Sequence, residues 1–362
     1  MTRCSSAASF QFQARQQSNS DNAQPGSHSA SCPAAAAPGM LPELPAQLQC
    51  SSRSEALRSD EHLPYSCTVV SGALMEYAAK HLNETEETRK KGLKELRELL
   101  KKDKELLFTD EDIFLLCFLR SRKFDVKRSA ELLRRGLEFV DSNSKLIDRS
   151  DAFNVVRKTM EANVIGFLPY RDRQGKAILY CRAEPWDPKE LPPEDAIFGS
   201  IVAIQTAMDN PVNQIAGFVV ILDLDELKMT QVIAMVPWLV FGIQALQSCC
   251  PCLVKQFHVI NTPSIFKVGW KLVKPIISTK IRKRISFHKS SNWTALHNIV
   301  PPTLLPTELG GQLGPFNNEH WAKDTDTMVR ECYKKFQANG ILSKKKQIAV
   351  PLEPEFNSCC NM

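Results

Sequence analysis

Two short stretches of the chain hold side chains that could carry chemistry. The first is Cys249-Cys250-Pro251-Cys252, which contains a C-x-x-C spacing, the pattern of redox centres and of half a zinc site. No second C-x-x-C and no nearby H-x3-H completes a tetrahedral zinc shell, so this pair supplies too few ligands. The twelve cysteines are scattered and no secretory apolar region lies near the start, so we expect reduced thiols in an intracellular protein. The sequence therefore predicts no metal site and no cofactor.

The second stretch is a basic cluster, Lys280-Ile281-Arg282-Lys283-Arg284. The net charge of +6 is small for 362 residues, so attraction to phosphate groups has to come from such local clusters. An apolar segment precedes the cluster, and in it Lys267, Lys271 and Lys274 fall at helical spacing on one narrow stripe. That pattern is typical of a helix at a membrane surface whose lysine stems extend to the headgroups. A buried helix with a solvated lysine edge is the alternative.

Motifs of the common enzyme classes are missing from the sequence. We find no G-x-S-x-G, H-E-x-x-H, G-x-x-x-x-G-K-[ST] or G-x-G-x-x-G. His258 and His288 lie in or after predicted strands, where a packed histidine is the simpler interpretation. No helix-turn-helix, zinc-finger or RNP-type pattern accompanies the basic cluster. We therefore expect neither an enzyme nor a nucleic-acid-binding protein, and we assign no catalytic residue.

The elements that would position these groups begin after a long N-terminal segment. Residues 1–69 are rich in Ser, Ala, Gln and Pro without apolar periodicity, which predicts a disordered tail. Residues 70–150 carry three amphipathic helix patterns, one starting at Asn83 with Glu86 as its capping-box partner. The other two start after Thr109 and at Asp125. Short links between the three predict a small helical bundle.

Residues 151–315 alternate β-branched runs with segments of helical length, which predicts an α/β fold with helices packed on a sheet. The run FVVILDL, residues 218–224, is almost continuously apolar and predicts a central strand covered on both faces. The run Val232–Leu246 is shorter than the ~20 residues of a membrane span and contains Pro237, so we expect a buried helix. Residues 316–362 are interpreted as a tail. Its terminal CCNM leaves prenylation at Cys359 open.

Four motifs, taken in order, resemble those of the CRAL-TRIO (Sec14-like) lipid-binding family, in particular its branch of tocopherol and retinaldehyde carriers. The resemblance implies a helical N-terminal subdomain and then a mixed, mostly parallel sheet flanked by helices, with a mobile gate helix over an apolar pocket. It also implies a protein that moves one hydrophobic molecule between membranes without covalent chemistry. The motifs are DEDIFLLCFLRSRKFDV (110–126), DRQGKAILYCRAEPWDP (172–188), AGFVVILDLDEL (216–227) with FHVINTPSIFKVGWKLVKPII (257–277), and LLPTELGG (304–311).

The same resemblance assigns a pocket and a gate. The gate helix matches residues 263–277, in which Ile265, Leu272, Ile276 and Ile277 would face the membrane. For each single pocket residue, an ordinary core position is the alternative. The residues that would line the lipid pocket are Ile197, Ser200, Ile201, Ile204, Phe218, Val220, Leu222, Ile243, Leu246, Phe266, Trp270 and Val273.

The resemblance also assigns a phosphoinositide-binding set, Arg122, Lys255, Lys280 and Arg284, whereas a fifth basic position of the family is Leu253 here. Convergent cations suit a phosphorylated headgroup because charge-assisted hydrogen bonds are stronger than neutral ones. We therefore expect a monomeric, cytoplasmic lipid-transfer protein that carries a tocopherol- or retinoid-like ligand. It would associate reversibly with phosphoinositide-containing membranes, endosomal ones included. A phosphatidylinositol- or phospholipid-binding sensor or trafficking regulator of the Sec14 type is the alternative.

Overall fold

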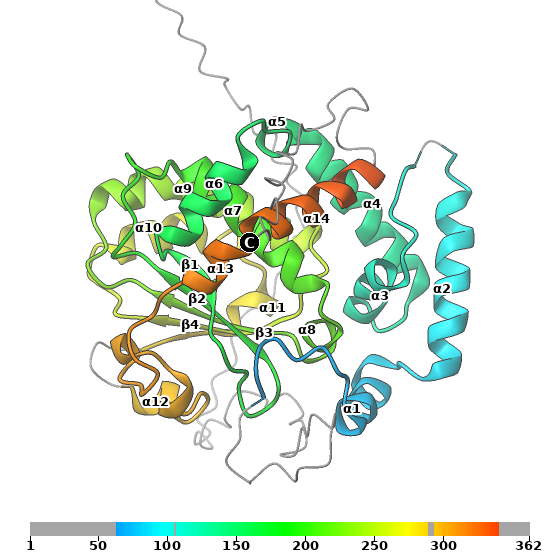
Figure 1. Cartoon of the computed structure of the whole chain (residues 1–362), viewed down its shortest axis with the longest axis horizontal. Coiled ribbons are helices and arrows are strands. Elements are labelled where there is room, and N and C mark those ends of the chain that lie inside the picture. Colours follow the sequence, from blue (N-terminus) through cyan, green and yellow to red (C-terminus); the bar gives the residue numbers. More distant parts are fainter. Residues whose placement is uncertain (1–62, 105, 289–292, 340–362) are drawn as a thin grey trace, which may run out of the picture. The chain divides into compact units, whose positions relative to one another are not determined.

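The computed structural model describes residues 63–104, 106–288 and 293–339 (Figure 1). The predicted disorder of residues 1–62 and the question of prenylation at Cys359 lie outside these ranges. Residues 63–69, which the sequence assigned to the disordered tail, pack beside strand β1 (Ile165–Phe167) and the loop that follows it. Tyr65 stacks on Phe167 with ring centres 4.9 Å apart, and its carbonyl oxygen accepts a hydrogen bond of 2.7 Å from the Arg171 guanidinium.

The N-terminal helices form from amphipathic segments. Leu96 and Leu100 recur on one side of α2 and are fully buried, and this helix contacts α3 and α4. α2 begins after Thr85, whose hydroxyl accepts a hydrogen bond from the Thr88 nitrogen, so the predicted start at Asn83 was wrong. Asn83 instead ends α1 with a φ of 62°, a left-handed conformation that asparagine tolerates. The helices of this part are α1 (Gly72–Leu82), α2 (Glu86–Lys101), α3 (Asp112–Ser121), α4 (Val126–Ser142) and α5 (Ser144–Ile147).

The predicted α/β class with a mixed, mostly parallel sheet is confirmed. The strands follow the order β1-β2-β3-β4-β5, with β1 antiparallel to β2 and all other neighbours parallel. β3 is central, as expected: Val219 and Ile221 pack on one face of the sheet, and Phe218 and Val220 on the other. The strands are β1 (Ile165–Phe167), β2 (Ala177–Arg182), β3 (Phe218–Asp223), β4 (Val254–Ile260) and β5 (Ile285–Phe287).

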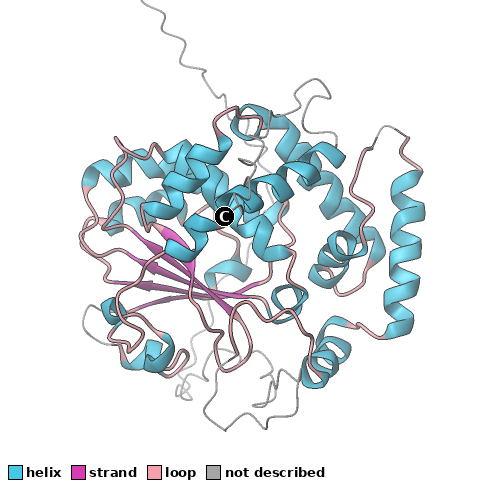
Figure 2. Ribbon diagram, viewed as in Figure 1, coloured by secondary structure: helices cyan, strands magenta, loops and turns pink. Residues whose placement is uncertain are grey.

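Helices cover both faces of this sheet (Figure 2). The Phe218 face packs in one apolar cluster with residues of α6, α7 and α14, and the Val219 face packs with α12 and two short 3-10 turns. α9 and α10 contact each other, and a four-residue helix, α11, follows them. The helices here are α6 (Ala152–Glu161), α7 (Pro193–Met208), α8 (Pro211–Ala216), α9 (Met229–Ser248), α10 (Phe266–Val273), α11 (Thr279–Arg282), α12 (Thr294–His297), α13 (Glu319–Lys323) and α14 (Thr325–Ala338).

The segment after residue 316 corrects the sequence interpretation. Residues 319–338, assigned to a tail because of their charge, form α13 and α14. Met328, Val329, Tyr333 and Phe336 recur on one side of α14 and are buried in the main core. Most of the charged residues of this segment, such as Glu331 and Lys334, are exposed, which is why composition alone suggested a solvated segment.

Candidate functional site

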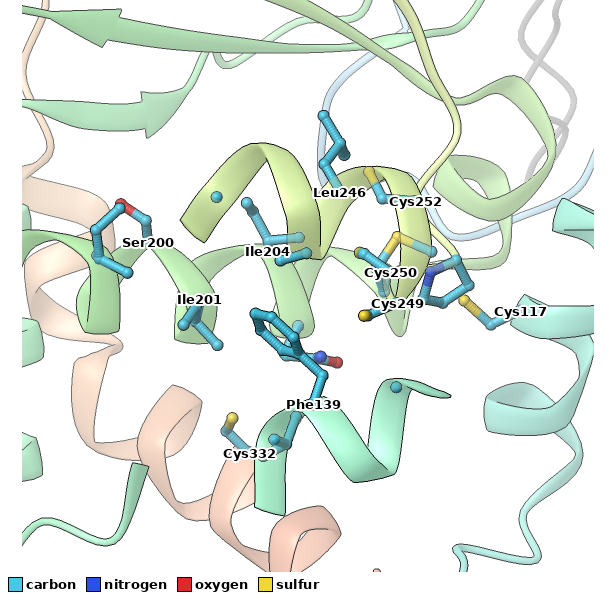
Figure 3. A pocket seen from close by; sticks show the side chains of 18 of the residues that line it. Cys117, Phe139, Ser200, Ile201, Ile204, Leu246, Cys249, Cys250, Cys252 and Cys332 are labelled. Atoms are coloured by element: carbon cyan, nitrogen blue, oxygen red, sulfur yellow. The ribbon is translucent and has the colours of Figure 1, made fainter. Parts of the chain in front are cut away.

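An apolar cavity of about 350 Å³ lies between the sheet and the helices that cover it (Figure 3). Its walls come from α3, α4, α7, α9, α14 and the inward face of the sheet. Phe139 of α4 and Phe241 of α9 both line it, with ring centres 4.9 Å apart. The two helices are also close at Gly136, where the Cβ of any larger residue would lie 3.0 Å from the Cys249 carbonyl oxygen. A larger residue at position 136 would separate the helices and open this end of the cavity.

Several polar groups at the cavity already have partners. The Ser200 hydroxyl donates a hydrogen bond of 2.7 Å to the Ala196 carbonyl, and the Asn143 amide donates one of 2.6 Å to Phe139. Lys335 forms an ion pair with Asp209. The cavity therefore offers a mainly apolar wall, which suits a ligand that is hydrophobic over most of its length.

The structure brings seven of the twelve predicted pocket residues to this cavity. Leu222 and Ile243 do not line it. Leu222 lies toward the carboxyl end of β3 and packs with the cluster around Leu224 and Val259. On α9, the wall is formed by other positions, Gly242 and Ala245 among them. The seven that line it are Ile197, Ser200, Ile201, Ile204, Phe218, Val220 and Leu246.

The predicted gate helix does not reach the cavity. α10 packs on α9, with Gly269 close to Val232, and α9 is the helix that forms the wall. Phe266 and Trp270 stack together with ring centres 6.0 Å apart, and Trp270 also contacts Phe287 of β5. Val273, the last predicted pocket residue of this helix, is buried away from the cavity.

Three of the four predicted membrane-facing residues are only partly exposed or buried. Ile277 is buried, and Ile265 and Ile276 are half-buried. Leu272 alone is exposed, as is its neighbour Val268. The apolar surface that α10 presents is therefore smaller than the sequence pattern predicted.

The expectation that the apolar run in α9 is buried was wrong. Met229–Gln247 is long and apolar enough to cross a membrane by length and composition, which for one helix is weak support for a span, and only 6% of that window is buried. Its inner side borders the cavity, while Ile233 and Leu239 on its outer side are exposed. An apolar helix therefore lies between the cavity and solvent.

A second cavity, of about 400 Å³, contains the predicted basic residues. Arg122, Lys280 and Arg284 line it, and Leu253 borders it at the position where the resemblance expected a further cation. Arg122 follows the last turn of α3, Lys280 lies in α11, and Arg284 immediately precedes β5. We refer to this cavity as the basic pocket.

Lys255, the fourth predicted residue, lies beside the basic pocket without lining it. Its ammonium nitrogen lies 5.9 Å from the centre of the Tyr77 ring. Burial, followed by the charge of Arg284, lowers the pKa of Lys255 to about 8. Burial also lowers the pKa of Lys280 and of Arg122, and neighbouring cations lower both further. Among the described residues none of these cations pairs with a carboxylate, so an anionic ligand would relieve their mutual repulsion.

The two cavities share a wall that the sequence interpretation missed. Part of it comes from the Cys-Cys-Pro-Cys segment that follows α9, and no spacing rule links that segment to phosphate or lipid binding. The only sequence feature that could have indicated this role is the position of the segment, directly between the apolar run of α9 and strand β4. The residues that line both cavities are Leu246, Cys250, Cys252, Val254 and Phe257.

Comparison with known proteins gives consistent results. Residues 161–311 match the family described as "CRAL/TRIO domain". The chain is 30% identical over 286 residues to "Alpha-tocopherol transfer protein-like" of Homo sapiens, which covers 75% of this chain and 81% of that protein. It is 28% identical over 253 residues to "Clavesin-2" of Homo sapiens, covering 69% and 77%. The solved structure "Crystal structure of Sfh5" matches with a TM-score of 0.45 and 13% identity, over 66% of this chain and 91% of that one.

Proposed function

The chain belongs to the CRAL/TRIO family of lipid-binding proteins, and from this premise we propose that it carries one small hydrophobic ligand and exchanges it at phosphoinositide-containing membranes. The observation that supports this most strongly is the shared wall between an apolar cavity and a pocket of unpaired cations. One cavity suits a lipid and the other a phosphorylated headgroup, so membrane recognition and ligand exchange would meet at the same residues.

The size and lining of the apolar cavity support a single small ligand. A volume of about 350 Å³ is near the lower end of the range for pockets that hold one small molecule. The wall is mainly apolar and its polar groups are largely paired, which favours a prenyl-chain alcohol or a similar neutral lipid. One relative is named for its likeness to a tocopherol transfer protein, which supports a tocopherol-like ligand here; a retinoid-like ligand would have the same apolar character.

The basic pocket supports a phosphoinositide as the membrane signal. Arg122, Lys280 and Arg284 converge from three separate elements, and each would donate charge-assisted hydrogen bonds to phosphate oxygens. Exposed Val268 and Leu272 on α10 lie among Lys267, Lys271 and Lys274, whose long stems suit a helix that lies in the headgroup region. We propose that the protein acts as a monomer on cytoplasmic membrane faces, endosomal ones included, and that ligand exchange needs movement of α9 and α10.

A phospholipid-binding sensor is the second candidate. The shared wall favours it, because one molecule could place its phosphate in the basic pocket and an acyl chain in the apolar cavity. The small volume of the apolar cavity weighs against a lipid with two acyl chains.

The test is binding to vesicles with and without a phosphoinositide. The double change Lys280→Ala with Arg284→Ala should weaken phosphoinositide-dependent binding at least about tenfold, because two charge-assisted contacts are lost. The matched control, Arg282→Ala with Lys283→Ala, removes the same charge from residues that do not line the basic pocket, and it should reduce binding far less. Because Arg284 also donates a hydrogen bond to the Val254 carbonyl, Lys280→Ala alone is measured as well. Equal losses in the two double variants, or loss of lipid held in solution, would contradict the assignment.

A further inference from the structure

Six thiols line the apolar cavity. Seven cysteines lie in the described residues, and all but Cys67 border this cavity. None of the six forms a disulfide. Buried cysteines often serve as small apolar side chains, but a thiolate is also a nucleophile that can react with an electrophilic ligand. The six are Cys117, Cys181, Cys249, Cys250, Cys252 and Cys332.

Four of these cysteines gather at the end of the cavity next to the basic pocket. Figure 3 shows Cys117, Cys249, Cys250 and Cys252 together there, with Cys332 apart from them. Cys250 interacts electrostatically with both Cys117 and Cys249, and its strongest electrostatic interaction is with Cys252. Over the described residues, no three His, Cys, Asp or Glu side chains are placed to hold a metal ion, so the cluster is not a metal site.

Cys250 differs from the other thiols of the cavity. Interaction with Cys252 lowers the pKa of Cys250 although burial acts in the opposite direction, whereas burial raises the pKa of Cys181 and Cys332 to about 12. Cys250 and Cys252 both border the basic pocket as well as the apolar cavity. Cys250 therefore combines a lowered thiol pKa with a place where the space for a lipid chain meets the basic pocket.

We propose that this cavity captures long-chain α,β-unsaturated carbonyl lipids covalently, with Cys250 as the nucleophile. The inference rests on the proposed lipid-carrying function and specifies a ligand class for the same site. The chain of such a lipid would occupy the apolar cavity, and its conjugated carbonyl would lie at the end where the thiols gather. Holding the two reacting groups together would raise the rate in the way of an intramolecular reaction.

The reaction needs no oxidant, reductant or co-reactant. The Cys250 sulfur forms a bond to the β-carbon, and the carbon-carbon double bond breaks, with its electron pair moving toward the carbonyl as an enolate. The proton that leaves the Cys250 thiol is taken up at the α-carbon, which restores the carbonyl. The product is a thioether that keeps the lipid in the cavity.

The experiment compares two enals of different length on the full chain. Trans-2-nonenal and trans-2-pentenal carry the same reactive group, so any difference in rate comes from binding of the chain. We expect Cys250 to be modified at least about tenfold faster by nonenal, because each additional methylene is buried in the cavity. Intact-protein mass spectrometry gives the rate, and peptide mapping after borohydride reduction gives the site. Cys250→Ser should abolish the fast reaction, and the matched control Cys332→Ser, in the same cavity, should retain it.

Displacement of a fluorescent lipid by saturated nonanal, run in parallel, separates this inference from the proposed function. Equal rates for the two enals, or modification spread over cysteines outside the cavity, would overturn the inference. Displacement by nonanal without any enal adduct would overturn it and leave the proposed function in place. No displacement and no adduct would contradict both. Should Cys250→Ser fail to fold, a second measurement is made on the wild type. A saturated nine-carbon alcohol should compete for the cavity and slow the reaction with nonenal. An unchanged rate would show that the reaction does not take place in the cavity.

Discussion

The backbone nitrogen of Ser278 donates a hydrogen bond of 2.6 Å to the side-chain oxygen of Gln247. The amide nitrogen of Gln247 in turn donates one of 3.1 Å to the Ile276 carbonyl. One side chain near the end of α9, the wall of the apolar cavity, thus holds the turn that joins α10 to the basic cluster. Gln247 also lines the basic pocket, so a headgroup bound there would contact the residue that fixes this turn.

The first prediction concerns this pair of hydrogen bonds. Gln247→Leu removes both, and at about 0.5–1.5 kcal/mol for each the turn should open more readily. We expect release of a fluorescent lipid to acceptor vesicles to accelerate by roughly fivefold or more. Gln244→Leu is the control, because Gln244 is an exposed residue of the same helix. A release rate equal to that of the wild type would show that α9 and α10 move independently of this contact.

The second prediction concerns the buried ion pair that joins the N-terminal helices. Arg120 donates hydrogen bonds of 2.8 and 2.7 Å to the two oxygens of Glu84, whose side chain is fully buried. Glu84→Ala leaves the buried guanidinium without its carboxylate, with only the hydrogen bond to the Gln214 side chain remaining, and should lower the free energy of unfolding by about 3–5 kcal/mol. The exposed Glu86, paired with Lys90, is the control, and its removal should cost less than about 1 kcal/mol. Urea unfolding measures both, and similar losses would contradict the assignment.

The third prediction is a pH dependence from two buried histidines. His258 Nδ1 lies 2.9 Å from His288 Nε2, and burial, followed by the charge of His288, lowers the pKa of His258 to about 4. Lys176 adds a further cation near His258, and burial also lowers the pKa of His288. His258 in the unfolded chain binds a proton near pH 6.5, whereas the folded His258 does not. The contribution of His258 to the free energy of unfolding is therefore full above about pH 6.5 and is lost as the pH falls toward 4.

Titration of His258 should lower the free energy of unfolding by about 2 kcal/mol between about pH 7 and pH 4.5. His258→Gln should flatten that part of the profile, whereas His320→Gln, at an exposed position, should leave it unchanged. Urea unfolding across the pH range checks the slope. A profile for His258→Gln as steep as that of the wild type would show that other groups control the acid response.

The sequence predicted the fold correctly where a residue pattern is compatible with only one kind of environment, such as full burial. The continuous apolar run of β3 requires cover on both faces, and Val219 and Phe218 do pack on opposite faces of the sheet. The C-terminal helix α14 was missed because its buried residues, Val329 and Phe336 among them, alternate with charges that dominate the composition. α1 was missed for a different reason, since its buried residues pack on α8, a helix distant in the sequence.

The site was predictable only in part, because an apolar residue is equally suited to a core and to a cavity. On α7, Ile197, Ile201 and Ile204 recur at helical spacing, and all three line the apolar cavity. On α10, Phe266 and Trp270 instead pack with Phe287, a contact between segments distant in sequence that no local pattern contains. Of the four basic residues that the resemblance assigned, Arg122, Lys280 and Arg284 line the basic pocket, whereas Lys255 lies beside it, because a position along the chain does not fix the direction of a long side chain.

The most direct test of the central claim is the mass of the lipid that the purified full chain retains. Native mass spectrometry, followed by extraction and identification, should find one neutral hydrophobic molecule, at roughly one per chain, in the cavity of about 350 Å³. A stoichiometric two-chain phospholipid would support the sensor instead. A protein that retains no lipid and takes none from vesicles would contradict the account.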